Sequence, residues 1–140
     1  MIDFGKLQKT LKHLQRQHEN YVNSNNRPEL NALVHEALSE SVIQRFEICY
    51  DSTWKLLKRY LVESLGVADV PNSPKPILRL AAENYLLASS VEQWFKYATA
   101  RTETSHHYSS EKASLCLDIV PEFIEDAVQL YEKLTEQTWE

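Results

Sequence analysis

The sequence predicts an all-α protein, an antiparallel four- to five-helix up-and-down bundle. Only two of the 140 residues are glycine and five are proline, a composition that favours long helices over turn-rich sheets. Apolar residues recur at three- and four-residue spacing through most of the chain, which is the period of an amphipathic helix. The connections between these segments are mostly short, and short connections favour antiparallel neighbours. A single domain over residues 1–140 is expected, because this length can enclose one core.

A first helix is expected at the start of the chain. Asp3 is a plausible N-cap, and apolar residues recur from Phe4 to Tyr21 with basic residues between them. The polar run 23–28 breaks this pattern. The first element is therefore expected to be an amphipathic helix.

A longer second helix is expected from Glu29 to Leu65, with Pro28 near its first turn. Its apolar arc is wide, which is typical of a helix in the centre of a bundle. Gly66 suits the end of the helix. Residues 67–75, which include two prolines, are expected to form a loop.

Two shorter helices and a long one complete the chain. The first of them is expected to start at Pro76 and to carry apolar residues as far as Leu87. Ser89 or Ser90 can cap the next helix, which is expected to end at Arg101. A polar segment, 102–110, follows. The last helix is expected to begin with Ser109 or Ser110 as its cap and to run past Leu134, with a kink at Pro121.

The charge of the chain limits the classes of function. The net charge is -5, and residues 102–140 contain nine acidic and two basic residues. This argues against a general nucleic-acid coat protein, because non-specific affinity for nucleic acid comes mainly from lysine and arginine. No apolar run approaches the roughly 20 residues of a transmembrane helix, and the N-terminus has no apolar signal segment. We expect a cytoplasmic protein that does not associate with membranes.

Cysteine and histidine spacing does not indicate a metal centre. Cys49 and Cys116 lie on apolar helical patterns and form no CxxC pair, so buried free thiols are expected. His106 and His107 are adjacent, and with Glu103 they offer at most an incomplete zinc site. No metal and no cofactor are expected.

The segment from Arg101 to Tyr108 contains a permanent cation, two imidazoles and a phenol. Arginine has a planar fork of donors that fits phosphate oxygens, and histidine exchanges protons near neutral pH. If Arg101 and His106 converge, the arginine would stabilise charge on a phosphate group while the histidine moves a proton. The alternative is that Arg101 pairs with an acidic neighbouring helix and that the histidines are ordinary loop residues.

A second cluster lies on the predicted central helix. Glu47, Asp51, Lys55 and Arg59 are four residues apart and therefore share one face. They are either an exposed ladder of ion pairs or the lining of a cleft in which Glu47 or Asp51 orients Arg101. Both interpretations are compatible with the sequence.

Two motifs carry a resemblance to a known family. The run from Val42 to Lys58 contains Arg-Phe-Glu and Trp-Lys-Leu-Leu-Lys elements, and it resembles the central helix of the nucleotidyltransferase substrate-binding family of the HEPN superfamily. The stretch Arg101…Ser105-His106…Tyr108 resembles that family's Arg-Asn-x-x-Ser-His-x-Tyr motif, and Trp94 also has a counterpart. The resemblance extends from about residue 40 to residue 134. One departure is Thr102, which stands where the family usually has asparagine.

The resemblance implies a helical bundle that forms a homodimer, with the Arg–His segments facing a shared cleft. It also implies a separately encoded minimal nucleotidyltransferase as partner, giving a heterotetramer. The chain would be an accessory subunit that presents a nucleotide or another substrate. Arg101, His106 and Tyr108 would form the contact site, with Glu47 and Thr102 beside them.

Two other functions stay open. One is a metal-independent RNase toxin of a toxin–antitoxin pair, with Arg101 and His106 as catalytic residues and Tyr108 as the target of silencing adenylylation. In this case RNA is the substrate, and Thr102 in place of asparagine bears on activity. The other is a structural role, in which the acidic C-terminal helix bridges other proteins.

Overall fold

The computed structural model describes residues 2–106 and 109–140, with the side chains of residues 105 and 106 left outside the description. Within this part all regular elements are helical, which confirms the predicted all-α bundle. None of the described helices is long and apolar enough to cross a bilayer. The elements are α1 (Gly5–Ser24), α2 (Ala32–Arg59), the π-helical turn η1 (Tyr60–Ser64), α3 (Pro74–Glu83), α4 (Val91–His106) and α5 (Ser110–Thr135).

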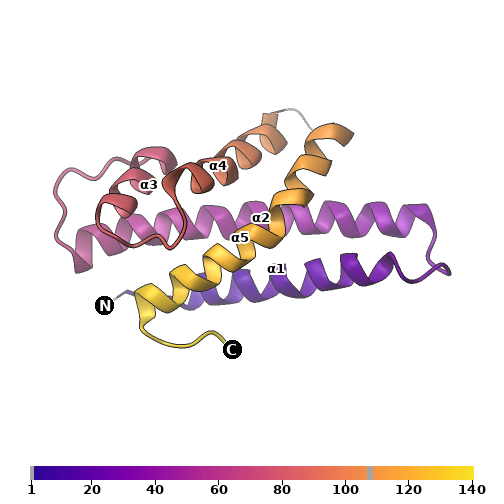
Figure 1. The fold of residues 1–140 in the computed structure, drawn as a ribbon, viewed down its shortest axis with the longest axis horizontal. Coiled ribbons are helices and arrows are strands. Elements are labelled where there is room, and N and C mark those ends of the chain that lie inside the picture. Colours follow the sequence, from indigo (N-terminus) through magenta and orange to yellow (C-terminus); the bar gives the residue numbers. More distant parts are fainter. Residues whose placement is uncertain (1, 107–108) are drawn as a thin grey trace.

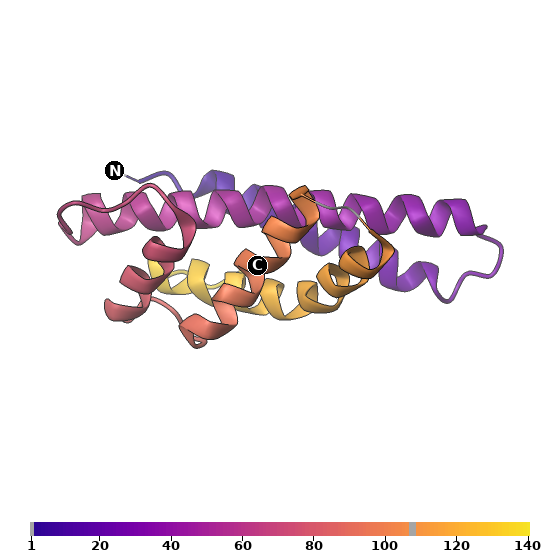
Figure 2. The same cartoon turned by 90° about the horizontal axis from the view of Figure 1, so that it is seen from above.

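Helices α1 and α2 form a long antiparallel hairpin, and the other three helices pack on one side of it (Figure 1, Figure 2). Helix α5 crosses this hairpin obliquely and contacts α1, α2 and α4. Helix α2 contacts all four other α-helices. The expected central position of the second helix is therefore confirmed.

An aromatic cluster joins α2, α4 and α5 at the centre of the core. The ring of Phe123 on α5 lies 5.0 Å from Phe46, 5.2 Å from Tyr97 and 6.1 Å from Trp94, in edge-to-face geometries. All four side chains are fully buried. Edge-to-face pairs add attraction beyond the burial of area, so these rings fix how the three helices meet.

A buried carboxylate ties α4 to α5. Asp126, only 7% exposed, accepts hydrogen bonds from the hydroxyls of Tyr97 and Ser89. Burial, together with the hydrogen bond to Asp126, raises the pKa of Tyr97. A buried charge is tolerated when it is hydrogen-bonded, and Asp126 thus has a structural role on the otherwise exposed acidic face of α5.

The first helix begins slightly differently from the prediction. Asp3 does not occupy the N-cap position, which belongs to Phe4. The Asp3 carboxylate instead accepts the backbone N–H of Gly5 at 2.8 Å. The aspartate therefore satisfies one of the free amides at the helix start from one position further out.

The second helix starts later than expected. Pro28 lies in a turn, and Asn31 is the N-cap, with its side chain accepting the N–H of Val34 at 2.9 Å. The Asn31 side chain thus pairs a backbone N–H at the helix start that would otherwise have no partner. A helix that started at Glu29 would lack this cap. At the other end Gly66 has a φ of +65° and stops the helical backbone after η1, as predicted.

Helix α3 begins at Pro74, inside the expected loop, and two residues before Pro76. Both prolines fall in the first turn, where a missing N–H costs little. The helix ends at Glu83 and does not extend to Leu87. Tyr85 has a φ of +60°, which no continuing helix can accommodate.

The caps of α4 and α5 are serines, as predicted. Ser90 accepts the backbone N–H of Gln93 at 3.2 Å, and Ser109 accepts that of Lys112 at 3.2 Å. Helix α5 runs through Pro121 without ending. The serine hydroxyls therefore set both helix starts.

The two cysteines are free and buried, as predicted. Burial raises the pKa of each thiol from 9.0 to about 12.

The raised pKa of the two thiols predicts that stability depends on pH. The folded chain keeps protons that the unfolded chain loses above pH 9, so stability is full below pH 9 and declines as the pH rises towards 12. The loss should reach up to about 2.7 kcal/mol per pH unit for both thiols together. Urea unfolding of wild type and of the Cys49→Ala/Cys116→Ala variant from pH 8 to 11 measures it, and parallel pH profiles would refute the prediction.

Candidate functional site

Helix α4 continues into the segment that was expected to connect two helices. The prediction of a polar connection over 102–110 is wrong for residues 102–106, which are helical. Threonines disfavour a helix interior because their hydroxyls compete for backbone groups. Here Thr102 donates to the carbonyl of Ala98 at 3.0 Å within the same helix, and Thr104 is buried. Tertiary packing against α2 therefore overrides a weak local preference.

Arg101 is held by two carboxylates of α2. Its Nη1 lies 3.1 Å from Glu47 Oε2, while Nη2 and Nε lie 3.1 and 3.3 Å from the two oxygens of Asp51. The contact with Asp51 is bidentate, the geometry in which arginine binds carboxylates most firmly. The hydrogen bond to Asp51 is the main reason why the pKa of Arg101 is raised. This pairing is the alternative expected from the sequence, in which Arg101 pairs with an acidic neighbouring helix, and it also agrees with the interpretation in which Glu47 and Asp51 orient Arg101.

A threonine hydroxyl completes this cluster. Thr104 Oγ1 donates to Glu47 Oε2 at 2.7 Å, so Glu47 receives bonds from two residues of α4. Glu47 and Asp51 are four residues apart on α2, which places both on the face that meets α4. The guanidinium is part-buried, with 28% of its side chain exposed. Two carboxylates around one guanidinium give the cluster a formal charge of -1.

The other predicted site residues are described to different extents. Thr102 is on α4 beside Arg101 and is exposed. His106 is the last residue of α4, and its side chain lies outside the described residues, as do His107 and Tyr108 entirely. Positions 101 and 106 are on one helix, about 140° apart around its axis. The convergence of Arg101 and His106 stays a prediction.

A cavity of about 380 Å³ opens beside Arg101 between α2, the start of α3 and α4. Sequence reasoning gave no site role to three of its residues with polar or aromatic side chains, Tyr50, Trp54 and Lys75. Tyr50 and Trp54 flank Asp51 on α2, and their aromatic character next to the ion-pair face was the available signal. Lys75 comes from the first turn of α3, and no sequence spacing relates it to α2. The lining residues are Tyr50, Asp51, Trp54, Ser73, Pro74, Lys75, Ala98, Arg101 and Thr102.

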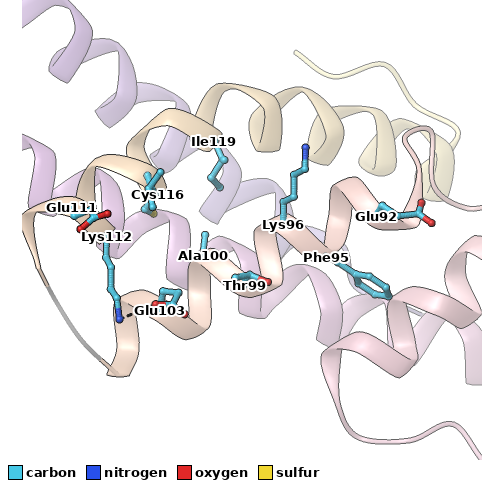
Figure 3. A pocket seen from close by; sticks show the side chains of 11 residues that line it. Glu92, Phe95, Lys96, Thr99, Ala100, Glu103, Glu111, Lys112, Cys116 and Ile119 are labelled. Carbon is cyan, nitrogen blue, oxygen red and sulfur yellow. Dashed lines mark ion pairs between the residues drawn. The ribbon is translucent and has the colours of Figure 1, made fainter.

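A second cavity, about 560 Å³, lies between α4 and α5 (Figure 3). Its wall is mainly apolar and includes Phe95, Cys116 and Ile119. The ion pair between Glu103 and Lys112, 2.8 Å long, closes one end of it (Figure 3). Burial raises the pKa of the Cys116 thiol, so this thiol keeps its proton and is a poor nucleophile near neutral pH.

Comparison with known proteins agrees with the fold and with the sequence motifs. The model of the family described as "Nucleotidyltransferase substrate binding protein like" matches residues 2–136. A probable ribonuclease HepT from Haemophilus influenzae is 30% identical over 108 residues, which cover 76% of this chain and 73% of that protein.

Two solved structures share the fold. One, from Haemophilus influenzae, is described as the fold of a substrate binding domain of a nucleotidyltransferase; it has a TM-score of 0.84 and 26% identity and covers 95% of this chain and 99% of its own. The other, a protein from Thermus thermophilus, has a TM-score of 0.73 and 26% identity and covers 91% of this chain and 98% of its own. The chain thus shares its all-helical fold with a protein described as a substrate binding domain of a nucleotidyltransferase. The chain belongs to the nucleotidyltransferase substrate-binding protein family.

Proposed function

We propose that this protein is the accessory subunit of a two-protein system, in which it binds a nucleotide or another substrate and presents it to a separately encoded minimal nucleotidyltransferase. The observation that carries the proposal is the guanidinium of Arg101, fixed by Glu47 and Asp51 at the wall of a cavity. A pre-oriented arginine binds a ligand without first losing its own conformational freedom. Family membership supports a nucleotidyltransferase as the partner.

In this proposal the contact site consists of Arg101, Thr102, His106 and Tyr108, and Glu47 positions the arginine. Three of the five N–H groups of the guanidinium bind the two carboxylates. The other two N–H groups have no partner among the described residues and could bind acceptors on a ligand. The net charge of the cluster is negative, so a phosphate would be bound best when His106 is protonated or when another cation is close.

We further propose that the chain forms a homodimer, and a heterotetramer with its partner in the cytoplasm. Large apolar side chains on two helices remain accessible, with Leu33 72% exposed and Leu115 60% exposed. Ile48, on the central helix close to the Arg101 cluster, is also exposed. Burying such residues between copies would contribute about 25 cal/mol per Å² of apolar area.

A second candidate function is that of a metal-independent RNase, favoured by the relative that is named a probable ribonuclease. His106 would take the proton of a ribose 2′-hydroxyl, whose oxygen attacks the adjacent phosphorus. The bond to the 5′-oxygen then breaks and this oxygen takes a proton from water, which leaves a 2′,3′-cyclic phosphate and a 5′-hydroxyl. Arg101 would stabilise the added negative charge, and adenylylation of Tyr108 would block the site.

Co-purification and RNA cleavage separate the two functions. When it is mixed with a minimal nucleotidyltransferase from the same genome, the chain should elute together with that protein as one complex. Light scattering measures the mass of this complex. Wild-type chain alone should leave single-stranded RNA intact. Release of fragments with cyclic phosphate ends, abolished by His106→Ala, would establish the RNase function instead. Failure to form a complex at micromolar concentrations would contradict the accessory role.

A further inference from the structure

The cavity beside Arg101 contains a buried hydroxyl with no partner. Tyr50 is 2% exposed, and its Oη has no hydrogen-bond partner among the described residues. Burial raises the pKa of this phenol, with the nearby Asp51 carboxylate adding to the effect, so the hydroxyl stays neutral and can donate or accept. Buried hydroxyls are usually paired, because an unpaired one costs free energy. Tyr50 is one of the residues that line the cavity, and a ligand group that reaches its hydroxyl would supply the missing partner.

The formal charges of the lining residues and of Glu47 sum to zero, while Lys55 lies outside the lining, over the ring of Trp54. The lining has one carboxylate, Asp51, and two cations, Lys75 and Arg101. Glu47, which binds the same guanidinium, brings the formal charge of the site to zero. A phosphate site needs surplus positive charge. The cavity is therefore better matched to an uncharged polar ligand than to a phosphate group.

The wall of the cavity also has an aromatic surface. Trp54 is part of the lining, and Lys55 lies 5.7 Å from the centre of its ring. Aromatic side chains hold unpaired nucleobases by stacking, and hydroxyl and guanidinium groups then bind the polar edge of the base. The volume, about 380 Å³, is within the range of small-molecule sites, roughly 300–1,000 Å³.

From these observations we infer that the cavity is a nucleobase subsite. Trp54 supplies the stacking surface, and the Tyr50 hydroxyl with the uncommitted N–H groups of Arg101 binds the edge of the base. The inference rests on the proposed function, and it deepens it by naming the base, rather than the phosphate, as the part recognised here. The base could belong to a free nucleotide or to a single-stranded RNA, since both present the same planar polar ring.

Calorimetric titration tests the subsite with adenosine, uridine, AMP and a 2′-O-methyl RNA octamer, which resists cleavage at the 2′-position. Wild type should bind at least one of the two nucleosides, because the subsite needs no phosphate. Tyr50→Phe should weaken that binding about tenfold, the effect of one lost hydrogen bond. The melting temperature of this variant should stay unchanged or rise, since its hydroxyl has no partner to lose. Trp54→Leu should weaken binding at least as much.

Tyr85→Phe is the matched control, because Tyr85 is 84% exposed and does not line the cavity. This variant should bind the nucleoside as wild type does.

The outcomes of the titration separate the two sources of the base. Tighter binding of the octamer than of AMP would assign the base to RNA, and tighter binding of AMP would assign it to a free nucleotide. The inference is overturned if wild type binds neither nucleoside, or if Tyr50→Phe and Trp54→Leu both bind like wild type. Complex formation with the nucleotidyltransferase is a separate readout, so loss of the subsite and loss of the accessory role are distinguishable.

Discussion

Phe123→Ala should lower the free energy of unfolding by about 3–5 kcal/mol, the usual cost of removing a buried phenylalanine. The ring lies against Phe46, Tyr97 and Trp94 from two other helices. Its removal therefore loses transfer free energy and leaves a cavity that three separate helices would have to close. The melting temperature should fall by roughly 10 °C. Urea unfolding followed by circular dichroism measures the change.

Phe95→Ala is the matched control for this substitution. Phe95 is half-buried at the rim of the cavity between α4 and α5, where the cationic groups of Lys75 and Arg79 lie 5.8 and 5.1 Å from its ring. Its removal opens a surface groove rather than the core, and the loss should stay below about 2 kcal/mol. Equal losses for the two variants would show that the aromatic cluster is not the centre of stability.

Helix positions could be predicted from the sequence where burial and local signals agree. The second helix has a wide apolar arc, and Phe46, Cys49 and Leu57 on it are all fully buried. The end of α4 was missed because the signal there is local and polar, while the stabilising contact is distant. Thr104 bonds to Glu47, which is 57 residues away in the chain. A sequence window cannot contain such a contact.

Only part of the candidate site could be predicted, because here too some of the contacts join residues that are distant in the chain. The shared face of Glu47 and Asp51 follows from helical spacing, and Arg101 followed from its motif. The cavity beside them depends on where α3 starts, because Lys75 reaches the site only from its first turn. Tyr50 is next to Asp51 in the sequence, and only the packed structure reveals that its hydroxyl has no partner among the described residues.

Arg101→Ala should lower the free energy of unfolding by about 2 kcal/mol. The substitution leaves Glu47 and Asp51 close together without their shared cation, which is the costly way to break an ion pair. The value is below that of a fully buried pair, because these side chains are 24% to 36% exposed and solvent screens the charges. Thermal and urea unfolding at low salt measure the change.

Arg59→Ala is the internal control, since the pair of Arg59 with Glu63 has the same chemistry but is about half exposed on both sides. Its removal should leave the melting temperature within error of wild type, because exposed ion pairs contribute little. Adding Glu47→Gln and Asp51→Asn to the Arg101→Ala variant should recover part of the loss, because the stranded charges disappear. If the triple variant is no more stable than Arg101→Ala alone, then packing of the arginine stem, and not its charge, anchors α4 to α2.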